Sequence, residues 1–204
     1  MLQAQQGKQG VSIIIPIIRP ESARRAVEAC RRQKTKRDIE VITEEDIERI
    51  GCPRMVKRLV ERTSHRWVMF LGDDTVPEGN IVEEAFRSAE ILPDGWGLVG
   101  LNDGHNQGSR LATHWMAHKN LLPGLDGEFF HTGYTHGYCD HELMQRCLSM
   151  GRYVYSPFAR LLHDHPIWRR EELTGDYARV YLGETYMKDL ILFRRRERAH
   201  WKSS

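Results

Sequence analysis

The sequence predicts an α/β fold in which a central, mainly parallel β-sheet is flanked by helices. In the first half of the chain, short apolar runs alternate with segments whose apolar residues recur at helical spacing. The runs are rich in β-branched residues and show no alternation of polar and apolar side chains. Such runs are typical of strands buried on both faces of a parallel sheet.

The elements of this half follow from the same two patterns. We expect four strands, at 11–18, 39–43, 67–71 and 97–101. We expect three helices between them, at 21–33, 54–63 and 77–91. Pro20 follows the first strand and Pro93 follows the last helix, where each interrupts the preceding element.

The second half is less regular. We expect a loop at 102–110, a strand at 111–119 and a turn at 122–127, followed by a helix at 140–150 that Gly151 ends. Two short strands at 152–155 and 158–162 precede one or two helices at 171–201. We predict a single domain over 1–204, with 1–10 flexible and 170–204 forming a helical extension.

Composition narrows the class of protein. The 204 residues include 30 Lys and Arg against 28 Asp and Glu, so the net charge of +2 neither demands nor excludes a polyanionic partner. No apolar run reaches the roughly 18–20 residues of a membrane helix, and the polar start lacks a signal core. We therefore expect a cytoplasmic protein. The four cysteines have no CxxC spacing and are interpreted as free thiols.

Three strand ends are predicted to meet at one edge of the sheet. Ligands of open α/β sheets bind beyond the carboxyl ends of the strands, which brings 16–19, 43–46 and 72–75 together. Asp73 and Asp74 are adjacent carboxylates that repel each other unless a positive group lies beside them. A divalent cation such as Mg²⁺ or Mn²⁺ is the usual solution. The alternative is a turn in which Asp74 caps the following helix.

Three further features are candidates for chemistry. Asp140 opens a helix and is either a cap or a general base. His163 and His165 stand two residues apart on an extended segment, so they either share a metal or form a surface turn before Pro166. A basic cluster near the end is interpreted as a solvated helix terminus, or else as a phosphate-docking patch; it consists of Arg194, Arg195, Arg196, Arg198 and Lys202. Tyr177 and Tyr181 are at helical spacing and are expected in the core.

Three motifs occur in an order that resembles one protein family. VSIIIPIIRP is similar to the family's opening strand and turn, and FLGDDTVP to the metal-binding segment that follows a hydrophobic strand. HGYCDHELMQRCLSMGRYVYSPFARLLHDHP resembles its acceptor-side block. From Val11 to Trp168 the chain therefore resembles the inverting GT-A glycosyltransferases (glycosyltransferase family 2-like), which include bacterial polysaccharide and phage enzymes. Gly72 and Cys139 depart from the pattern, because the family often has acidic residues there.

The resemblance implies a GT-A fold and a metal-dependent, inverting transfer of a sugar from a nucleoside-diphosphate sugar. It implies Mn²⁺ or Mg²⁺ as the cofactor, with Asp74 and His163 as metal ligands, His165 in reserve, and Asp140 as the general base. Within the donor site, the resemblance implies Glu44 at the nucleobase, Lys57 at the diphosphate and Asp73 near the ribose or a metal-bound water. The full set of donor-binding residues that it implies is Pro16, Ile17, Arg19, Glu44, Lys57, Asp73 and Asp103.

The acceptor and the competing functions stay open. A glycan, a protein or a modified DNA base is compatible with the sequence, and the basic cluster would serve DNA. One competitor is a nucleotidyltransferase, although the stretch 16–22 lacks the glycine-rich phosphate loop expected there. The other is a catalytically silent nucleotide-sugar-binding protein of the same fold.

Overall fold

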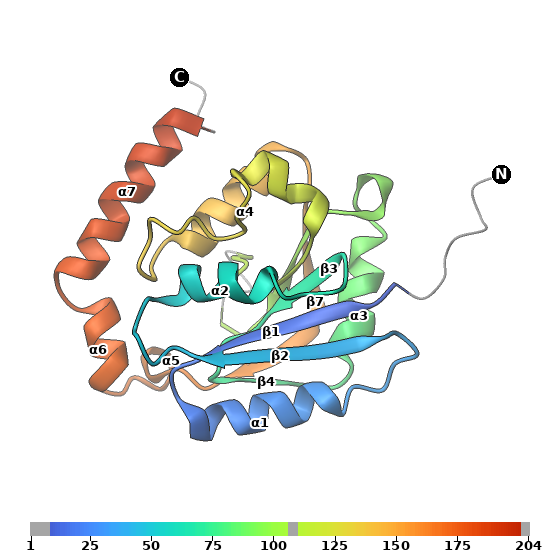
Figure 1. Ribbon diagram of the computed structural model, residues 1–204, viewed down its shortest axis with the longest axis horizontal. Helices are drawn as coiled ribbons and strands as arrows, with labels where there is room; N and C mark the ends of the chain where they lie inside the picture. The colour runs from blue at the N-terminus through green and yellow to red at the C-terminus, as the bar shows by residue number, and fades with distance from the viewer. Residues whose placement is uncertain (1–8, 106–109, 201–204) are drawn as a thin grey trace.

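The computed structural model describes residues 9–105 and 110–200. Most of the predicted flexible start, and Trp201 and Lys202 of the predicted C-terminal features, lie outside these residues. The described chain forms a seven-stranded sheet with helices on both faces (Figure 1). The predicted α/β fold class is thereby confirmed.

The first half contains the predicted alternation of strands and helices. Its elements are β1 (Val11–Ile17), α1 (Pro20–Arg31), β2 (Ile39–Glu45), α2 (Cys52–Val60), β3 (Trp67–Phe70), β4 (Thr75–Pro77), α3 (Ile81–Ala89), η1 (Pro93–Gly95) and β5 (Leu98–Asn102). The second half contains β6 (Trp115–His118), η2 (Lys119–Leu125), α4 (Cys139–Ser149), β7 (Tyr153–His163), α5 (Pro166–Arg169), α6 (Gly175–Tyr181) and α7 (Glu184–His200).

The sheet has the order β2-β1-β3-β6-β5-β7-β4. β1 pairs in parallel with β2 and β3, and β5 pairs in parallel with β7. β6 is inserted antiparallel between β3 and β5, and β4 lies antiparallel at the edge beside β7. Five strands therefore share one direction, and their carboxyl ends meet at one edge of the sheet.

The core lies on both faces of this sheet. Along β1, Val11, Ile13 and Ile15 pack into a cluster with α1 and α3, whereas Ile14 faces a second cluster with α2, α4 and α7. Each such aliphatic side chain contributes about 1.5–3 kcal/mol relative to an exposed one. This two-sided burial explains why the strand's sequence is apolar throughout.

Several element predictions were wrong in detail. The helix expected from residue 77 begins at Ile81, because Pro77 ends the short strand β4. The two strands expected at 152–162 are one strand, β7, whose pairing with β5 shifts register after Ser156. The turn expected at 122–127 is mostly the 3-10 helix η2, which accommodates Pro123.

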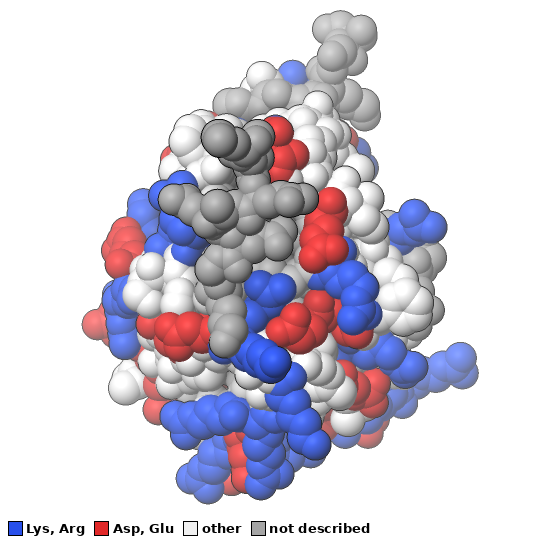
Figure 2. Space-filling view, turned by 90° about the vertical axis from the view of Figure 1, so that its right-hand side faces the viewer, with Lys and Arg blue, Asp and Glu red and all other residues white. Residues whose placement is uncertain are grey.

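Three remaining features are the cysteines, the absence of membrane-spanning helices among the described residues, and the surface charge. The cysteines are free, as predicted. Within the described ranges, no helix combines the length and the apolarity needed to cross a membrane. Figure 2 shows Lys and Arg side chains gathered along the lower part of one face, at the level of α1. The segment that ends α1 and follows it is basic and exposed at Arg31, Arg32, Lys34 and Lys36.

Candidate active site

A cavity of about 250 Å³ opens at the carboxyl ends of β1 and β3. The three predicted strand-end segments meet there, through Arg19, Asp46 and Asp73 among others. The predicted site residues that line it are Pro16, Arg19, Asp73, Asp74, Asp140, His163 and His165. Residues far apart in the sequence are thus brought together by the sheet topology.

Asp73 ties the end of β3 to the turn after β1. Its Oδ2 atom accepts hydrogen bonds from the backbone N–H groups of Ile18 (2.7 Å) and Arg19 (2.6 Å). The Arg19 guanidinium donates to Oδ1 from Nε (3.0 Å) and from Nη2. Burial alone would lower the pKa of Arg19, but the charges of Asp74 and Asp73 raise it. A fixed positive charge is therefore held at the cavity wall.

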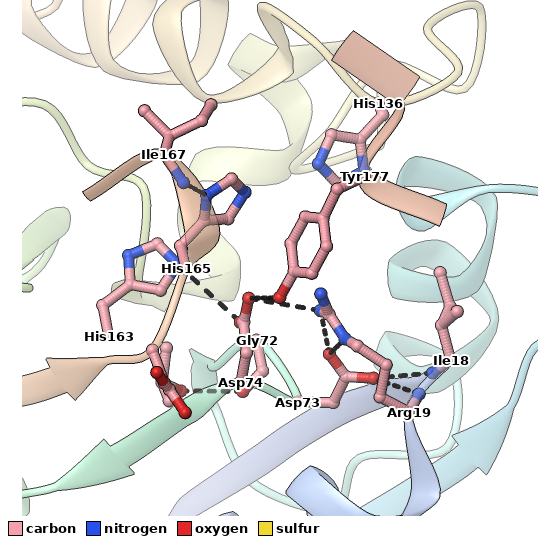
Figure 3. A network of polar contacts seen from close by, with 12 residues as sticks. Ile18, Arg19, Gly72, Asp73, Asp74, His136, His163, His165, Ile167 and Tyr177 are labelled. Atoms are coloured by element: carbon pink, nitrogen blue, oxygen red, sulfur yellow. Dashed lines mark hydrogen bonds and ion pairs between the residues drawn. The ribbon is translucent and has the colours of Figure 1, made fainter. Parts of the chain in front are cut away.

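Asp74 contacts three side chains of the cavity, those of Arg19, His163 and Tyr177 (Figure 3). Its Oδ2 atom accepts a hydrogen bond from the Tyr177 hydroxyl at 2.7 Å and lies 3.3 Å from Arg19 Nη2. Its Oδ1 atom faces His163, whose Nε2 is 3.7 Å away. Burial would raise the pKa of Asp74, but Arg19, His163 and Tyr177 together lower it, so the group is ionised at neutral pH. Because α3 begins at Ile81, Asp74 does not cap that helix.

His163 lies between two carboxylates. The β4–β7 pairing sets it opposite Thr75, next to Asp74. Its Nδ1 atom is 3.4 Å from Oδ2 of Asp103, a carboxylate with no exposed side-chain surface. Asp103 also accepts a hydrogen bond from the Thr113 hydroxyl at 2.9 Å. A carboxylate on Nδ1 fixes the orientation of an imidazole and aims Nε2 at whatever lies opposite.

His114 is a site residue that the sequence analysis missed. With Asp103 and His163 it forms a group whose potential ligand atoms lie within 4.8 Å of one another. Burial, reinforced by the nearby His163, lowers the pKa of His114 to about 3, so its ring is neutral and can offer a lone pair. Its buried Nδ1 has no hydrogen-bond partner within the described residues.

Gly72 provides the test of whether a cation fits here. A Cβ atom at Gly72 would lie 2.8 Å from Oδ1 of Asp74 and 3.2 Å from Nε2 of His114. A side chain would thus fill the space that the carboxylate and the imidazole share. Carboxylate oxygens suit Mg²⁺ and Mn²⁺, and imidazole suits transition metals. The donor set and the space left by Gly72 fit a divalent cation.

Asp140 lies at the start of α4 and lines the same cavity. Its side chain is 21% exposed, and Oδ1 accepts a hydrogen bond from the backbone N–H of His141 at 2.8 Å. The His141 ring lies 3.0 Å from the same oxygen. Burial would lower the pKa of His141, but the hydrogen bond and charge of Asp140 raise it. Oδ2 has no hydrogen-bond partner in the described part of the chain, so it is available to a substrate.

Some predicted donor-site residues do not line the cavity. Glu44 pairs with Arg58 at 2.8 Å and with Arg62 at 2.7 Å, and Lys57 pairs with Glu128 at 2.9 Å. Ile17, Glu44, Lys57 and Asp103 are not among the described residues that line the cavity.

Other residues occupy positions that the sequence did not suggest. Asp46, two residues beyond Glu44, does line the cavity, and its carboxylate accepts the N–H groups of Ile50 and Gly51. Tyr177 and Tyr181, expected in the core, form part of the cavity wall. The reserve histidine, His165, also lines the cavity, where its ring packs against that of Tyr177 with 4.4 Å between centroids.

Comparison with known proteins identifies the fold. No family model and no curated protein matches the chain. Among solved structures, it is similar to residues 1–349 of TarS from S. aureus in complex with UDP, with a TM-score of 0.58, 13% identity, and coverage of 94% of this chain and 72% of that one. It is also similar to the mannosyltransferase PcManGT from Pyrobaculum calidifontis in complex with GDP-Man and Mn²⁺, with a TM-score of 0.61, 13% identity, and coverage of 97% and 77%.

These likenesses define the class of fold. The chain has the architecture of the GT-A-type glycosyltransferases, as its motifs predicted. Full-length TarS gives the same likeness, with a TM-score of 0.59, over 95% of this chain and 44% of that one. At 12–13% identity the likeness establishes the fold, and the activity is argued from the site.

Proposed function

We propose that this protein is a metal-dependent, inverting glycosyltransferase that moves a sugar from a nucleoside-diphosphate sugar to an acceptor hydroxyl. One observation carries the proposal. A single cavity on this fold holds Asp74 and His163, whose facing atoms lie 3.7 Å apart, and a separate, partly free carboxylate at Asp140. Direct displacement needs both, because one stabilises the leaving group and the other accepts the acceptor's proton.

The donor diphosphate would bind at the Asp73–Asp74 side of the cavity. Asp74 and His163 would hold Mn²⁺ or Mg²⁺, with His114 as an additional ligand and His165 in reserve. When bound, this ion offsets the negative charge that grows on the departing diphosphate. Arg19 adds a fixed positive charge beside it. We retain Pro16, Ile17, Glu44, Lys57, Asp73 and Asp103 as proposed donor-side residues, and add Asp46 because it faces the cavity.

Asp140 would act as the general base. Its carboxylate takes the proton from the acceptor hydroxyl as that oxygen bonds to the anomeric carbon, and the bond from this carbon to the diphosphate oxygen breaks. The configuration at the anomeric carbon inverts because attack and departure occur on opposite faces. Burial raises the pKa values of Cys52 and Cys139, which also line the cavity, so neither thiol ionises at neutral pH to serve as a nucleophile.

The acceptor is left as a hydroxyl compound of open class: a glycan, a protein or a modified DNA base. Arg196 of the basic C-terminal cluster is only 12% exposed and is paired with Glu142, so it is not available for DNA. Arg195 and Arg198 are exposed and keep that possibility open. The basic segment after α1 lies near the amino ends of the parallel strands, because it precedes β2. The cavity lies near their carboxyl ends, because it is lined by residues that follow β1.

The proposal is tested by thermal unfolding with a panel of nucleoside diphosphates, with and without Mn²⁺. We expect one nucleotide to raise the unfolding temperature only when the metal is present, because a ligand of the folded state stabilises it by mass action. The responding nucleotide names the donor's base. If no nucleotide shifts the transition at millimolar ligand and metal, the transferase proposal is wrong.

Replacing Tyr177 by phenylalanine tests the metal position. The Tyr177 hydroxyl donates a hydrogen bond to Asp74 Oδ2, so its removal leaves more negative charge on the carboxylate for a cation beside Oδ1. We expect Tyr177→Phe to bind Mn²⁺ about 3–10-fold more tightly, the equivalent of one net hydrogen bond. Tyr155→Phe is the matched control, because the Tyr155 hydroxyl has no partner among the described residues. Weaker Mn²⁺ binding in Tyr177→Phe, measured by titration calorimetry, would argue against Asp74 as a ligand.

A further inference from the structure

The last helix, α7, contacts the catalytic segment through polar groups. The Asp189 side chain is 2% exposed and accepts three successive backbone N–H groups from the turn that precedes α4. The donors are Thr135 at 2.9 Å, to Oδ1, and His136 at 2.9 Å and Gly137 at 2.8 Å, both to Oδ2. Successive N–H groups of this kind form a concave anion-binding site. Here a carboxylate from more than fifty residues later fills it.

This turn sets the direction of the helix that bears Asp140. Tyr138, which follows the three N–H groups directly, has a φ of 64°, a left-handed conformation that is uncommon for a residue with a side chain. Asp140 is the second residue of α4. Any change at 135–138 therefore alters where the Asp140 carboxylate points into the cavity.

A second contact between α7 and α4 lies on the other side of Asp140. Glu142, 3% exposed, accepts hydrogen bonds from Arg196 at 2.8–3.0 Å and from the Tyr134 hydroxyl at 2.7 Å. Between the two polar contacts, the Tyr138 and Phe193 rings stack with 5.4 Å between centroids. The Tyr138 hydroxyl also bonds to that of Tyr186 at 2.7 Å. Tyr186, Asp189, Phe193 and Arg196 recur every three or four residues and form one face of α7.

We propose that Asp189 is a positioning residue, through which α7 holds the 135–137 turn and thereby aims the Asp140 carboxylate at the acceptor hydroxyl. The proposal rests on the proposed function for the role of Asp140. It gives the C-terminal helix a part in the reaction, although α7 contributes neither the base nor the cation ligands. The Asp189 carboxylate is suited to this role because its two oxygens accept all three N–H groups at once.

The test compares Asp189→Asn with the parent protein and with Glu184→Gln. The amide of asparagine has one acceptor oxygen, and its NH₂ group faces N–H donors, so the turn loses part of its support. Glu184, on the same helix, is 87% exposed, and its ion pair within the described residues is with Lys188. Its replacement is therefore expected to leave activity unchanged. The assay is release of nucleoside diphosphate by transfer to water, with Mn²⁺ and the nucleotide sugar whose base the nucleotide panel selects.

We expect Asp189→Asn to lower kcat about 100-fold, the effect of a catalytic group displaced by about 1 Å, with the donor KM within about twofold of the parent. Amide hydrogen exchange at 135–137 is expected to accelerate, while the other amides of the sheet keep their protection. A merely structural role would lower the unfolding temperature and raise KM without this selective fall in kcat. An unchanged kcat or unchanged exchange at 135–137 overturns the proposal.

Two further outcomes are distinguished by additional measurements: a variant that does not fold, and a failure of the proposed function. If Asp189→Asn does not fold, Asp189→Glu replaces it, because glutamate keeps the charge but places the carboxylate one methylene away from its position against the three N–H groups. The same selective fall in kcat is then expected, and its absence overturns the proposal. If the parent protein neither binds nucleotide with Mn²⁺ nor releases diphosphate, the proposed function fails. The exchange measurement then still decides whether Asp189 holds the turn.

Discussion

Asp140→Asn is expected to lower the rate of sugar transfer by ~10²–10⁴-fold, the loss that follows removal of a well-placed general base. Asparagine keeps an oxygen that can accept the His141 N–H, so the start of α4 is preserved. The amide cannot take a proton from an attacking hydroxyl. Donor affinity is therefore expected to stay within about twofold of the parent, because we propose that the donor's diphosphate binds at the Asp74 side of the cavity.

Release of nucleoside diphosphate from the nucleotide sugar, by transfer to water, measures this effect before the acceptor is known. Asp38→Asn is the matched control, since Asp38 is 81% exposed and immediately precedes β2, at the opposite edge of the sheet. A collapse of donor affinity in Asp140→Asn would make Asp140 a donor-binding or structural residue. Equal rates in both variants would remove Asp140 from the chemistry.

The parts of the fold that could be predicted were those whose signal is local. The buried strands β1 and β3 are continuous apolar runs, and the helices between them have a clear apolar period. The strand β4 could not be found this way, because it has three residues and owes its existence to pairing with β7, far along the chain. The register shift within β7 likewise depends on β5 and leaves no mark in the sequence.

The sequence identified those residues of the candidate site that lie at strand ends or within the family-like motifs. Asp74 and Asp140 were found in this way, and both line the cavity. His114 was missed because it immediately precedes an antiparallel strand, β6. The pairing of Phe70 with Trp115 carries His114 to the edge where the parallel strands end. Knowledge of the direction of β6 would have identified it; the histidine stands in no motif.

The polar face of α7 was missed for a different reason. Helical periodicity is read from apolar residues, whereas the inward face of α7 includes Asp189 and Arg196. The sequence therefore suggested that Arg196 belongs to a solvated basic terminus. Its side chain instead pairs with Glu142, where several hydrogen bonds offset the cost of burying the two charges.

Asp74→Ala is expected to abolish metal-dependent binding of the donor nucleotide. At a nucleotide concentration of 100 times Kd, binding stabilises the parent by about 2.7 kcal/mol. In a chain of this size that corresponds to an upward shift of roughly 5–10 °C in the unfolding temperature. Without the Asp74 carboxylate the cation loses its acidic ligand opposite His163, so the shift caused by Mn²⁺ and nucleotide together should vanish.

Asp74→Asn separates the loss of charge from the loss of packing, because the amide oxygen can still accept the Tyr177 hydroxyl. We expect this variant to unfold near the parent's temperature without ligand and to show little response to Mn²⁺ with nucleotide. Arg19 remains paired with Asp73 in both variants, so the cavity wall keeps its positive charge. A full Mn²⁺-dependent shift in Asp74→Asn would indicate that the cation binds instead at the neighbouring group of Asp103, His114 and His163. The variant His114→Gln would then be expected to abolish the shift.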